Sequence, residues 1–224
     1  MKGAEYIIDA LVREGISHIF GYPGGAIMPV YDALVDSPIK HVLCRHEQGA
    51  ALAADGYART SGGPGVCLAT SGPGATNLLT GLANAYMDSV PLIAITGQVA
   101  SHLMGTDAFQ EIDIFGMAMP VVKHSYVVTD VADLPHIMSN ALHLATSGRP
   151  GPVLIDVPKD IQIAEFSPEP VAHKTDSLPL LSQDTLQQAC QLLRKAKRPL
   201  LYIGGGVAIG KAEETIIDPL KTYC

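Results

Sequence analysis

Tryptophan is absent from this sequence, and cysteine, aromatic and charged residues are scarce. The 224 residues include four cysteines, 5% aromatic and 17% charged residues. The cysteines stand far apart and form no CxxC pair, so the sequence predicts neither a zinc site nor a disulfide framework. They are Cys44, Cys67, Cys190 and Cys224. We therefore predict no metal site in this chain and reduced thiols, as in a cytoplasmic protein.

Basic residues are also few, with 15 Lys and Arg against 22 Asp and Glu, for a net charge of −7. Nucleic-acid binding needs a clustered basic surface, so this balance argues against such a partner. No apolar run is long enough to cross a membrane, and no signal peptide precedes the first helical pattern. Because 47% of the residues are hydrophobic, we expect a globular chain that binds small molecules.

Short apolar runs alternate with helical patterns over most of the chain. The runs are bounded by glycine, proline or polar residues, which is typical of buried strands. They are SHIFGY (17–22), HVLCR (41–45), GVCLAT (65–70), PLIAIT (91–96) and GPVLIDVP (151–158). Helical spacing predicts helices near 3–14, 48–60, 75–87 and 133–147. The alternation predicts an α/β fold, with a mostly parallel sheet covered by helices on both faces.

A prolyl, polar stretch without periodicity follows this pattern and indicates a domain boundary. We predict a first domain over 1–165, a linker over 166–184 and the start of a second α/β domain over 185–224. The last part should contain a helix over 186–197 and a strand in RPLLYIGGG (198–206). The glycines after that strand do not complete GxGxxG, so they predict a tight turn rather than a nucleotide site.

Three glycine-bearing turns follow predicted strands of the first domain: GYPGGA (21–26), TSGPGATN (70–77) and TGQVASHLMGTDAFQE (96–111). In a parallel sheet such turns leave the carboxyl ends of the strands, where ligands of open α/β folds bind. We therefore expect the three turns to converge. None carries the GK[ST] of a phosphate-binding loop.

Glu47 lies where the apolar run HVLC gives way to alanines and glycines. A lone glutamate there is ordinarily a solvated acid in the first turn of a helix. Its place at the expected meeting point of the turns supports a second interpretation, a carboxyl group that holds or hands over a proton near neutral pH. His46 beside it is best interpreted as a packing or capping residue. From the residues alone, both interpretations of Glu47 stay open.

Five long motifs, in matching order, resemble the amino-terminal pyrimidine domain of thiamine-diphosphate enzymes. Within that class they resemble most closely the catalytic subunits of acetolactate synthase. The motifs are FGYPGGAIMPVYDAL (20–34), CRHEQGAALAADGYAR (44–59), TSGPGATNLLTGLANAYMDSVPLIAITGQV (70–99), GTDAFQEIDIFG (105–116) and SGRPGPVLIDVPKDIQ (147–162). The resemblance runs from residue 1 to about 165, and RPLLYIGGG is similar to the start of that family's middle domain.

The resemblance implies roles for individual residues. Glu47 would hydrogen-bond the aminopyrimidine and activate the cofactor. Gly24, Gly25, Pro73 and Asn77 would lie around the cofactor, where Gly24 and Gly25 could equally form an ordinary turn and Asn77 an ordinary helix start. Phe109 and Gln110 would border the substrate, and Lys159 would stand at the active-site entrance. Without the resemblance, Phe109 and Gln110 would be interpreted as a core aromatic residue beside a surface amide, and Lys159 as a solvated lysine. Arg149 would contact a flavin.

The resemblance also implies an activity and partners. The reaction would be a transferase step of branched-chain amino-acid biosynthesis, in which pyruvate condenses with pyruvate or 2-oxobutyrate and loses CO2. The cofactors would be thiamine diphosphate, Mg²⁺ held by a carboxyl-terminal domain that this sequence does not contain, and FAD. A homodimer or larger homo-oligomer, with the site between subunits, and a small regulatory subunit are expected. The chain looks like a truncated amino-terminal piece that would be inactive alone. The alternatives are another thiamine-diphosphate-dependent carboligase or decarboxylase, and a non-catalytic dimerisation module.

Overall fold

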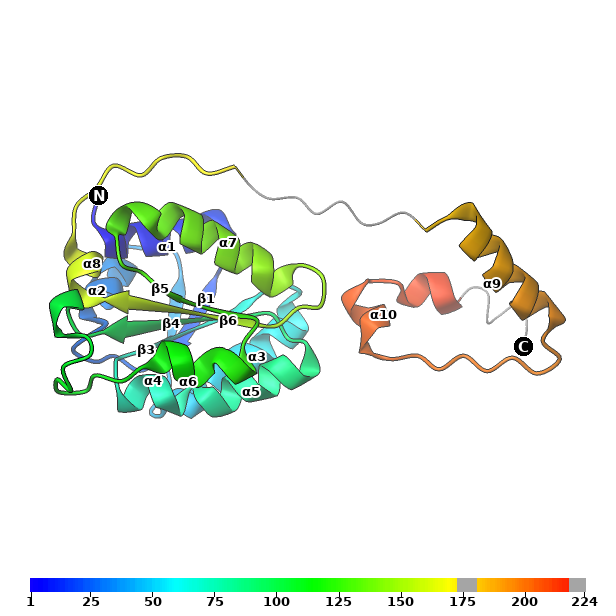
Figure 1. The fold of residues 1–224 in the computed structure, drawn as a ribbon, viewed down its shortest axis with the longest axis horizontal. Helices are drawn as coiled ribbons and strands as arrows, with labels where there is room; N and C mark the ends of the chain where they lie inside the picture. The colour runs from blue at the N-terminus through cyan, green and yellow to red at the C-terminus, as the bar shows by residue number, and fades with distance from the viewer. Residues whose placement is uncertain (173–180, 218–224) are drawn as a thin grey trace. The chain divides into compact units, whose positions relative to one another are not determined.

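The computed structural model describes residues 1–172 and 181–217 (Figure 1). The chain divides into two units, Met1–Asp176 and Ser177–Cys224. Phe166, the first residue of the predicted linker, still packs in the first unit, because its ring meets that of Tyr6 edge to face with centroids 5.6 Å apart. Residues 173–180 of the predicted linker and Cys224 lie outside the described ranges. The predicted domain limits stay a prediction.

The first unit is built on a six-stranded sheet in which every neighbouring pair is parallel, in the order β2-β1-β3-β4-β6-β5. The central strands are buried along their whole length, which explains their mostly apolar sequences. The strands are β1 (His18–Gly21), β2 (Lys40–Leu43), β3 (Gly65–Ala69), β4 (Leu92–Gln98), β5 (His124–Val127) and β6 (Pro152–Pro158). The predicted α/β fold with a parallel sheet is confirmed.

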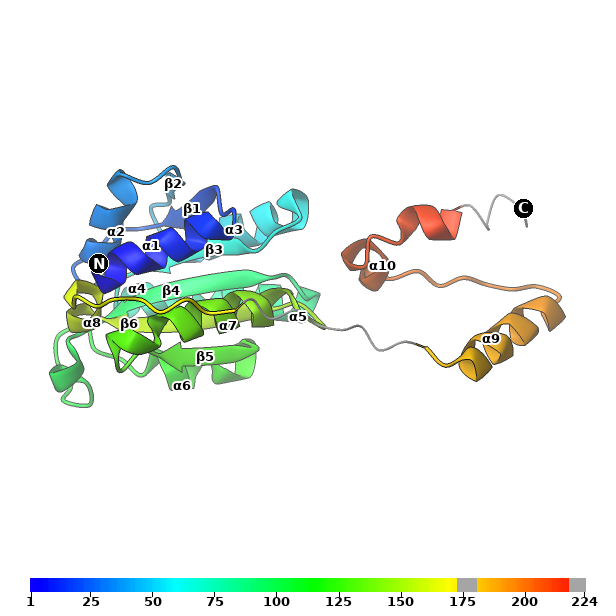
Figure 2. The ribbon, with the colours of Figure 1, turned by 90° about the horizontal axis from the view of Figure 1, so that it is seen from above.

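Helices cover both faces of this sheet, as Figures 1 and 2 show. One face carries α1 (Gly3–Arg13), α2 (Met28–Val35), α7 (Leu134–Thr146) and α8 (Lys159–Ile163). The other carries α3 (Glu47–Ser61), α4 (Pro73–Asn77), α5 (Leu79–Asp88) and α6 (Ile114–Ala118). Short 3₁₀ turns are η1 (Ser101–Leu103), η2 (Met119–Val121) and η3 (Val131–Asp133). A hydrophobic core lies between the sheet and each helix layer, and alternate residues of β4 contribute to the two cores. Ile93 and Ile95 pack in the core under α1, and Leu92 and Ala94 pack in the core under α3.

The strand β2 corrects one prediction. HVLCR was expected to be a buried strand, but Val42 and Leu43 are 40% and 57% exposed. The reason is its place in the sheet, since β2 is an edge strand that pairs only with β1. The apolar sequence is the same in either position, so it could not reveal this exposure.

The second unit, in its described residues 181–217, contains α9 (Gln183–Lys195) and α10 (Gly205–Ile209). Ser182 caps α9, because its hydroxyl accepts a hydrogen bond from the Thr185 amide at 3.1 Å. The predicted helix is thus present. The predicted strand in RPLLYIGGG is wrong, because residues 199–204 form no strand and the glycines begin α10. A strand needs a hydrogen-bonded neighbour, and the sheet pairing includes none for this segment.

Candidate functional site

The three glycine-bearing turns meet at the carboxyl edge of the sheet. The Ala26 amide of the first turn donates to Thr70 Oγ1 of the second at 3.2 Å. A Cβ on Gly72 of the second turn would lie 2.6 Å from the Gln110 carbonyl oxygen of the third. A Cβ on Gly97 would lie 2.2 Å from the Ala26 carbonyl oxygen, which joins the third turn to the first. The predicted convergence is therefore confirmed, and it depends on glycine where backbones pass closely.

Glu47 is the first residue of α3 and lies at this meeting point. His46 caps the helix, since its Nδ1 accepts a hydrogen bond from the Gln48 amide at 3.2 Å. The capping interpretation of His46 is confirmed. Glu47 itself is only 7% exposed, and its Oε2 accepts a hydrogen bond from Asn77 Nδ2 at 2.9 Å. The solvated first-turn acid is therefore wrong, because the carboxyl group is buried and held by a residue 30 positions away.

Small residues close the space around the Glu47 carboxyl group. A Cβ on Gly74 would lie 3.1 Å from Glu47 Oε1 and 2.7 Å from Thr70 Cγ2. A Cβ on Gly24 would lie 2.5 Å from Thr70 Cβ. Thr70 thus fills the space between these two glycines. Gly25 differs, because a Cβ there would meet no atom within 4 Å, so packing within the described residues does not require glycine at that position.

The third turn presents Phe109 and Gln110 at the same edge. Phe109 is 88% exposed, so the alternative of a core aromatic is wrong. Gln110 adopts φ +60°, an uncommon value for a residue with a Cβ. The Glu111 carboxylate stabilises this turn, because it accepts hydrogen bonds from the Gly105 amide at 2.8 Å and the Asp107 amide at 2.9 Å.

Lys159 and Pro73 also lie at the carboxyl edge. Lys159 is the exposed first residue of α8 and directly follows β6. The next residue, Asp160, accepts hydrogen bonds from the Ser101 amide at 3.0 Å and hydroxyl at 3.1 Å. The start of α8 is thereby tied to the segment that leads to Gln110. Pro73 is the exposed first residue of α4, where its missing amide proton costs no hydrogen bond.

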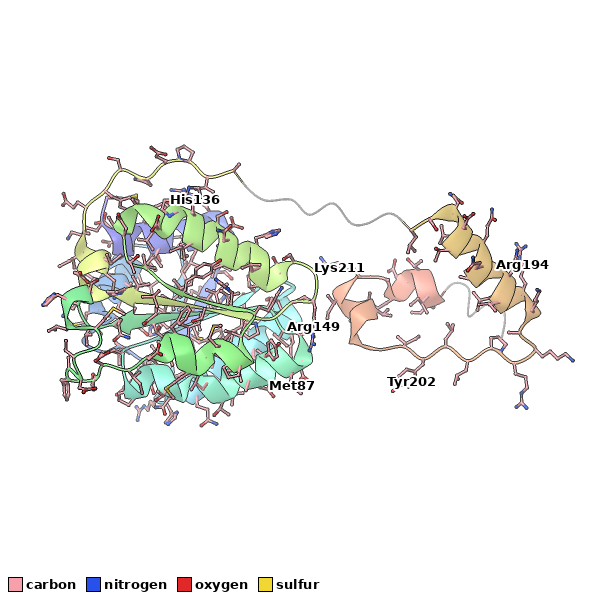
Figure 3. All side chains as sticks on the ribbon, in the orientation of Figure 1. Met87, His136, Arg149, Arg194, Tyr202 and Lys211 are labelled. Atoms are coloured by element: carbon pink, nitrogen blue, oxygen red, sulfur yellow. The ribbon has the colours of Figure 1, made fainter. Side chains whose placement is uncertain are left out.

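Arg149 is the predicted site residue that the structure does not bring to this edge. It precedes β6 and lies at the amino edge of the sheet, beside the end of α5 that carries Met87 (Figure 3). Its Nε donates to Ser89 Oγ at 2.7 Å, and its Nη2 donates to the Tyr86 and Met87 carbonyl oxygens, each at 3.2 Å. Within the first unit, Arg149 therefore caps α5.

Within 1–172 and 181–217, no group of three or more His, Cys, Asp and Glu side chains could hold a metal ion. Cys44, Cys67 and Cys190 are free thiols. None of the described helices is both long and apolar enough to span a bilayer.

Comparison with known proteins identifies the class to which this fold and site belong. Residues 1–117 match the family model described as thiamine pyrophosphate enzyme, N-terminal TPP binding domain. The chain belongs to the thiamine pyrophosphate enzymes. The predicted family is thereby confirmed.

The particular relatives are large subunits of acetolactate synthase. The chain is 55% identical over 212 residues to the acetolactate synthase isozyme 2 large subunit of Escherichia coli K12, which covers 95% of this chain and 39% of that protein. It is 52% identical over 208 residues to the isozyme 1 large subunit of the same organism, covering 92% and 37%. A probable acetolactate synthase large subunit of Methanocaldococcus jannaschii is 52% identical over 225 residues, covering 97% and 38%. The chain thus spans about two fifths of the length of these relatives.

Sequence reasoning missed several residues that organise the site. Thr70 was assigned no role, although it joins the first turn to the second. Asp156 was treated as part of an apolar strand and Gln98 as part of the third turn, yet both lie in buried strands, are 1% and 2% exposed, and hydrogen-bond each other. A polar residue inside a buried strand is the signal that could have identified them, because burial of such a group requires a partner.

Proposed function

We propose that this chain supplies the aminopyrimidine-binding part of an acetolactate synthase, an enzyme that condenses pyruvate with pyruvate or 2-oxobutyrate and releases CO2. The observation that carries the proposal is the buried carboxyl group of Glu47, at the carboxyl edge where three turns converge. The homology to acetolactate synthase large subunits over nearly the whole chain supports the choice of reaction.

The residues around Glu47 fit a flat, hydrogen-bonding ring. Asn77 binds one carboxylate oxygen, and no hydrogen bond from the described residues reaches the other, Oε1. Thiamine diphosphate, when bound, supplies the electron-accepting ring that decarboxylation of a 2-oxo acid requires. Glu47 Oε1 would hold or release the proton shared with a ring nitrogen, while Asn77 fixes the carboxyl orientation. Gly74 and Thr70 would keep water from the buried side of that contact.

The substrate side is proposed to consist of Phe109, Gln110 and Lys159. An exposed aromatic ring at the carboxyl edge of the sheet is suited to contact an apolar substrate group. The Gln110 amide can donate to a carbonyl or carboxylate oxygen. Lys159 would attract the carboxylate of a 2-oxo acid through a solvent-screened charge. Gly24, Gly25 and Pro73 are proposed to lie beside the cofactor, where Gly25 leaves room for close approach.

Further partners rest on the resemblance to these relatives. We propose FAD with Arg149 as one contact, Mg²⁺ with ligands from outside the described residues of this chain, a homo-oligomer, a small regulatory subunit and a cytoplasmic location. The exposed apolar side chains of β2 and α3, among them Val42, Leu43 and Leu52, support self-association. Nε and Nη2 of Arg149 already cap α5, so a flavin contact that keeps this cap would have to use Nη1.

A chimera tests the proposed reaction. This chain replaces the matching segment of the E. coli isozyme 2 large subunit, and acetolactate formation from pyruvate is measured with thiamine diphosphate, Mg²⁺ and FAD. We expect acetolactate as the product. A folded chimera that binds thiamine diphosphate and releases CO2 without acetolactate would favour another thiamine-dependent carboligase or decarboxylase.

A folded, oligomeric chimera that fails to bind thiamine diphosphate would favour the dimerisation module.

For the chain alone, we expect thiamine diphosphate binding no tighter than the millimolar range, because Glu47 and its neighbours offer only a few hydrogen bonds, each worth about 1 kcal/mol. Titration calorimetry on residues 1–224 measures this affinity.

A further inference from the structure

Three buried polar side chains lie together near the carboxyl ends of β4 and β6. Thr96, Gln98 and Asp156 are 0%, 2% and 1% exposed, inside strands that are otherwise apolar apart from Gly97. Thr96 Oγ1 donates to Asp156 Oδ1 at 2.7 Å, and Gln98 Nε2 donates to Asp156 Oδ2 at 3.0 Å. Burial of polar groups in a core is costly unless every group has a partner, so the placement of these three needs a reason.

The Gln98 side chain contacts both ends of the segment that follows it. Its Oε1 accepts a hydrogen bond from the Val99 amide at 2.9 Å, and its Nε2 donates to the Ile112 carbonyl oxygen at 2.9 Å. One amide group therefore joins the beginning and the end of residues 99–112. Asp156 fixes the orientation of this amide, because a flipped amide would turn Oε1 towards the acceptors on Asp156 and Ile112.

The segment between these two contacts carries Phe109 and Gln110. Its tip makes few apolar contacts, since Phe109 is 88% exposed. The hydrogen bonds of the Glu111 carboxylate go to amides of the same segment, so they shape the tip without attaching it to the rest of the domain. The Gln110 backbone rests against Gly72. The position of the tip over the site therefore depends on how firmly the base of the segment is held.

We propose that Gln98, oriented by Asp156, is the positioning residue that holds Phe109 and Gln110 at the edge of the Glu47 site. The catalytic relevance of this contact rests on the proposed function, whereas the contact itself can be tested without catalysis. Loss of the Gln98 amide should free the Ile112 end of the segment. The Ser101 end keeps its hydrogen bonds to Asp160.

Asp156 should be replaceable by asparagine in this role. In Asp156→Asn, the new side-chain carbonyl would accept from Gln98 Nε2, and the new amide would donate to Thr96 Oγ1, because a hydroxyl group can accept as well as donate. Asp156→Leu removes both acceptors. The double variant Asp156→Asn/Gln98→Met removes the amide contact without leaving a buried carboxylate that has lost a donor. It keeps the proposal testable if Gln98→Met alone fails to fold.

Hydrogen exchange followed by mass spectrometry on residues 1–224 tests the proposal. We expect peptides covering 99–112 to exchange roughly tenfold faster in the double variant, the effect of losing one or two hydrogen bonds. Peptides of β3 and β6 should exchange as in the wild type. Measured against the β3 and β6 peptides of the same variant, the 99–112 peptides of Asp156→Asn should exchange as in the wild type, and those of Asp156→Leu as in the double variant. Ser125→Ala is the control, since Ser125 Oγ is buried on β5 without a hydrogen-bond partner among the described residues.

Three results would overturn the proposal. The first is that residues 99–112 exchange at the wild-type rate in the double variant. The second is that exchange accelerates equally in every strand. The third is that residues 99–112 exchange as fast in Asp156→Asn as in the double variant. In the chimera, the double variant should lower acetolactate turnover. The proton on C2 of the thiazolium ring of bound thiamine diphosphate should still exchange with solvent at the wild-type rate (C2 proton exchange). A chimera that makes no acetolactate even without substitutions would contradict the proposed function and leave the exchange result standing.

Discussion

The buried carboxyl group of Asp156 should make the unfolding free energy of the first unit depend on pH. Burial raises the pKa of Asp156 from 3.8 to about 7. Hydrogen bonds from Thr96 and Gln98 oppose this rise, and the nearby charge of Asp113, which caps α6, adds to it. The folded chain therefore keeps a proton between about pH 4 and pH 7 that the unfolded chain releases.

The sign and size of the effect follow from this difference. Because the folded state binds more protons, the contribution of Asp156 to stability is fully present below about pH 4 and is lost as the pH rises to about 7. A pKa difference of about three, at about 1.4 kcal/mol for each pH unit, gives a loss of about 4 kcal/mol. Asparagine does not titrate, so Asp156→Asn should gain stability relative to the wild type over this range.

Urea unfolding followed by circular dichroism, at several values between pH 4.5 and pH 8, measures this difference. The unfolding free energy of Asp156→Asn minus that of the wild type should rise with pH and level off above about pH 7.5. Asp36→Asn is the control, because Asp36 is exposed at the end of α2, and its curve should run parallel to the wild type. A pH-independent or falling difference for Asp156→Asn would refute the reasoning.

Two further predictions concern the glycines and the substrate side. Gly24→Ala should lower the unfolding free energy by about 1–3 kcal/mol, because its Cβ would clash with Thr70, whereas Gly25→Ala should change it by less than about 0.5 kcal/mol; equal effects in urea unfolding would contradict this. In the chimera, Lys159→Met and Gln110→Ala should impair pyruvate use and retain C2 proton exchange, with the Lys159 effect weakening as salt rises. Loss of exchange in both variants would exclude a substrate-side role.

The apolar pattern predicted the elements that are buried on both sides. The runs that became β3, β4 and β6 are mostly apolar, and each lies between other strands and under helices. It missed β5 (His124–Val127), an edge strand whose sequence HSYV mixes polar and apolar residues. It also missed α2, α6 and α8, of which α6 and α8 have only five residues each and show no full helical period.

The candidate site was predictable in its location and not in its contacts. Parallel strands require their carboxyl ends to share one edge, so the convergence of the turns followed from their order along the chain. The Glu47 to Asn77 hydrogen bond joins residues 30 positions apart, and no local pattern encodes it. The cofactor role of Glu47 and the substrate role of Gln110 came from resemblance to a family, because spacing alone identifies a buried carboxyl group and not its ligand.

Glu47 is proposed to be the proton-handling group of a thiamine-diphosphate site. The most direct measurement is C2 proton exchange of bound thiamine diphosphate in the chimera, comparing the wild type with Glu47→Gln and with Glu169→Gln, a surface glutamate control. Glutamine keeps the shape and the contact with Asn77 while it loses the proton site. Exchange should fall by roughly two to four orders of magnitude in Glu47→Gln and stay unchanged in Glu169→Gln. Wild-type exchange in Glu47→Gln, with the cofactor bound, would contradict the account.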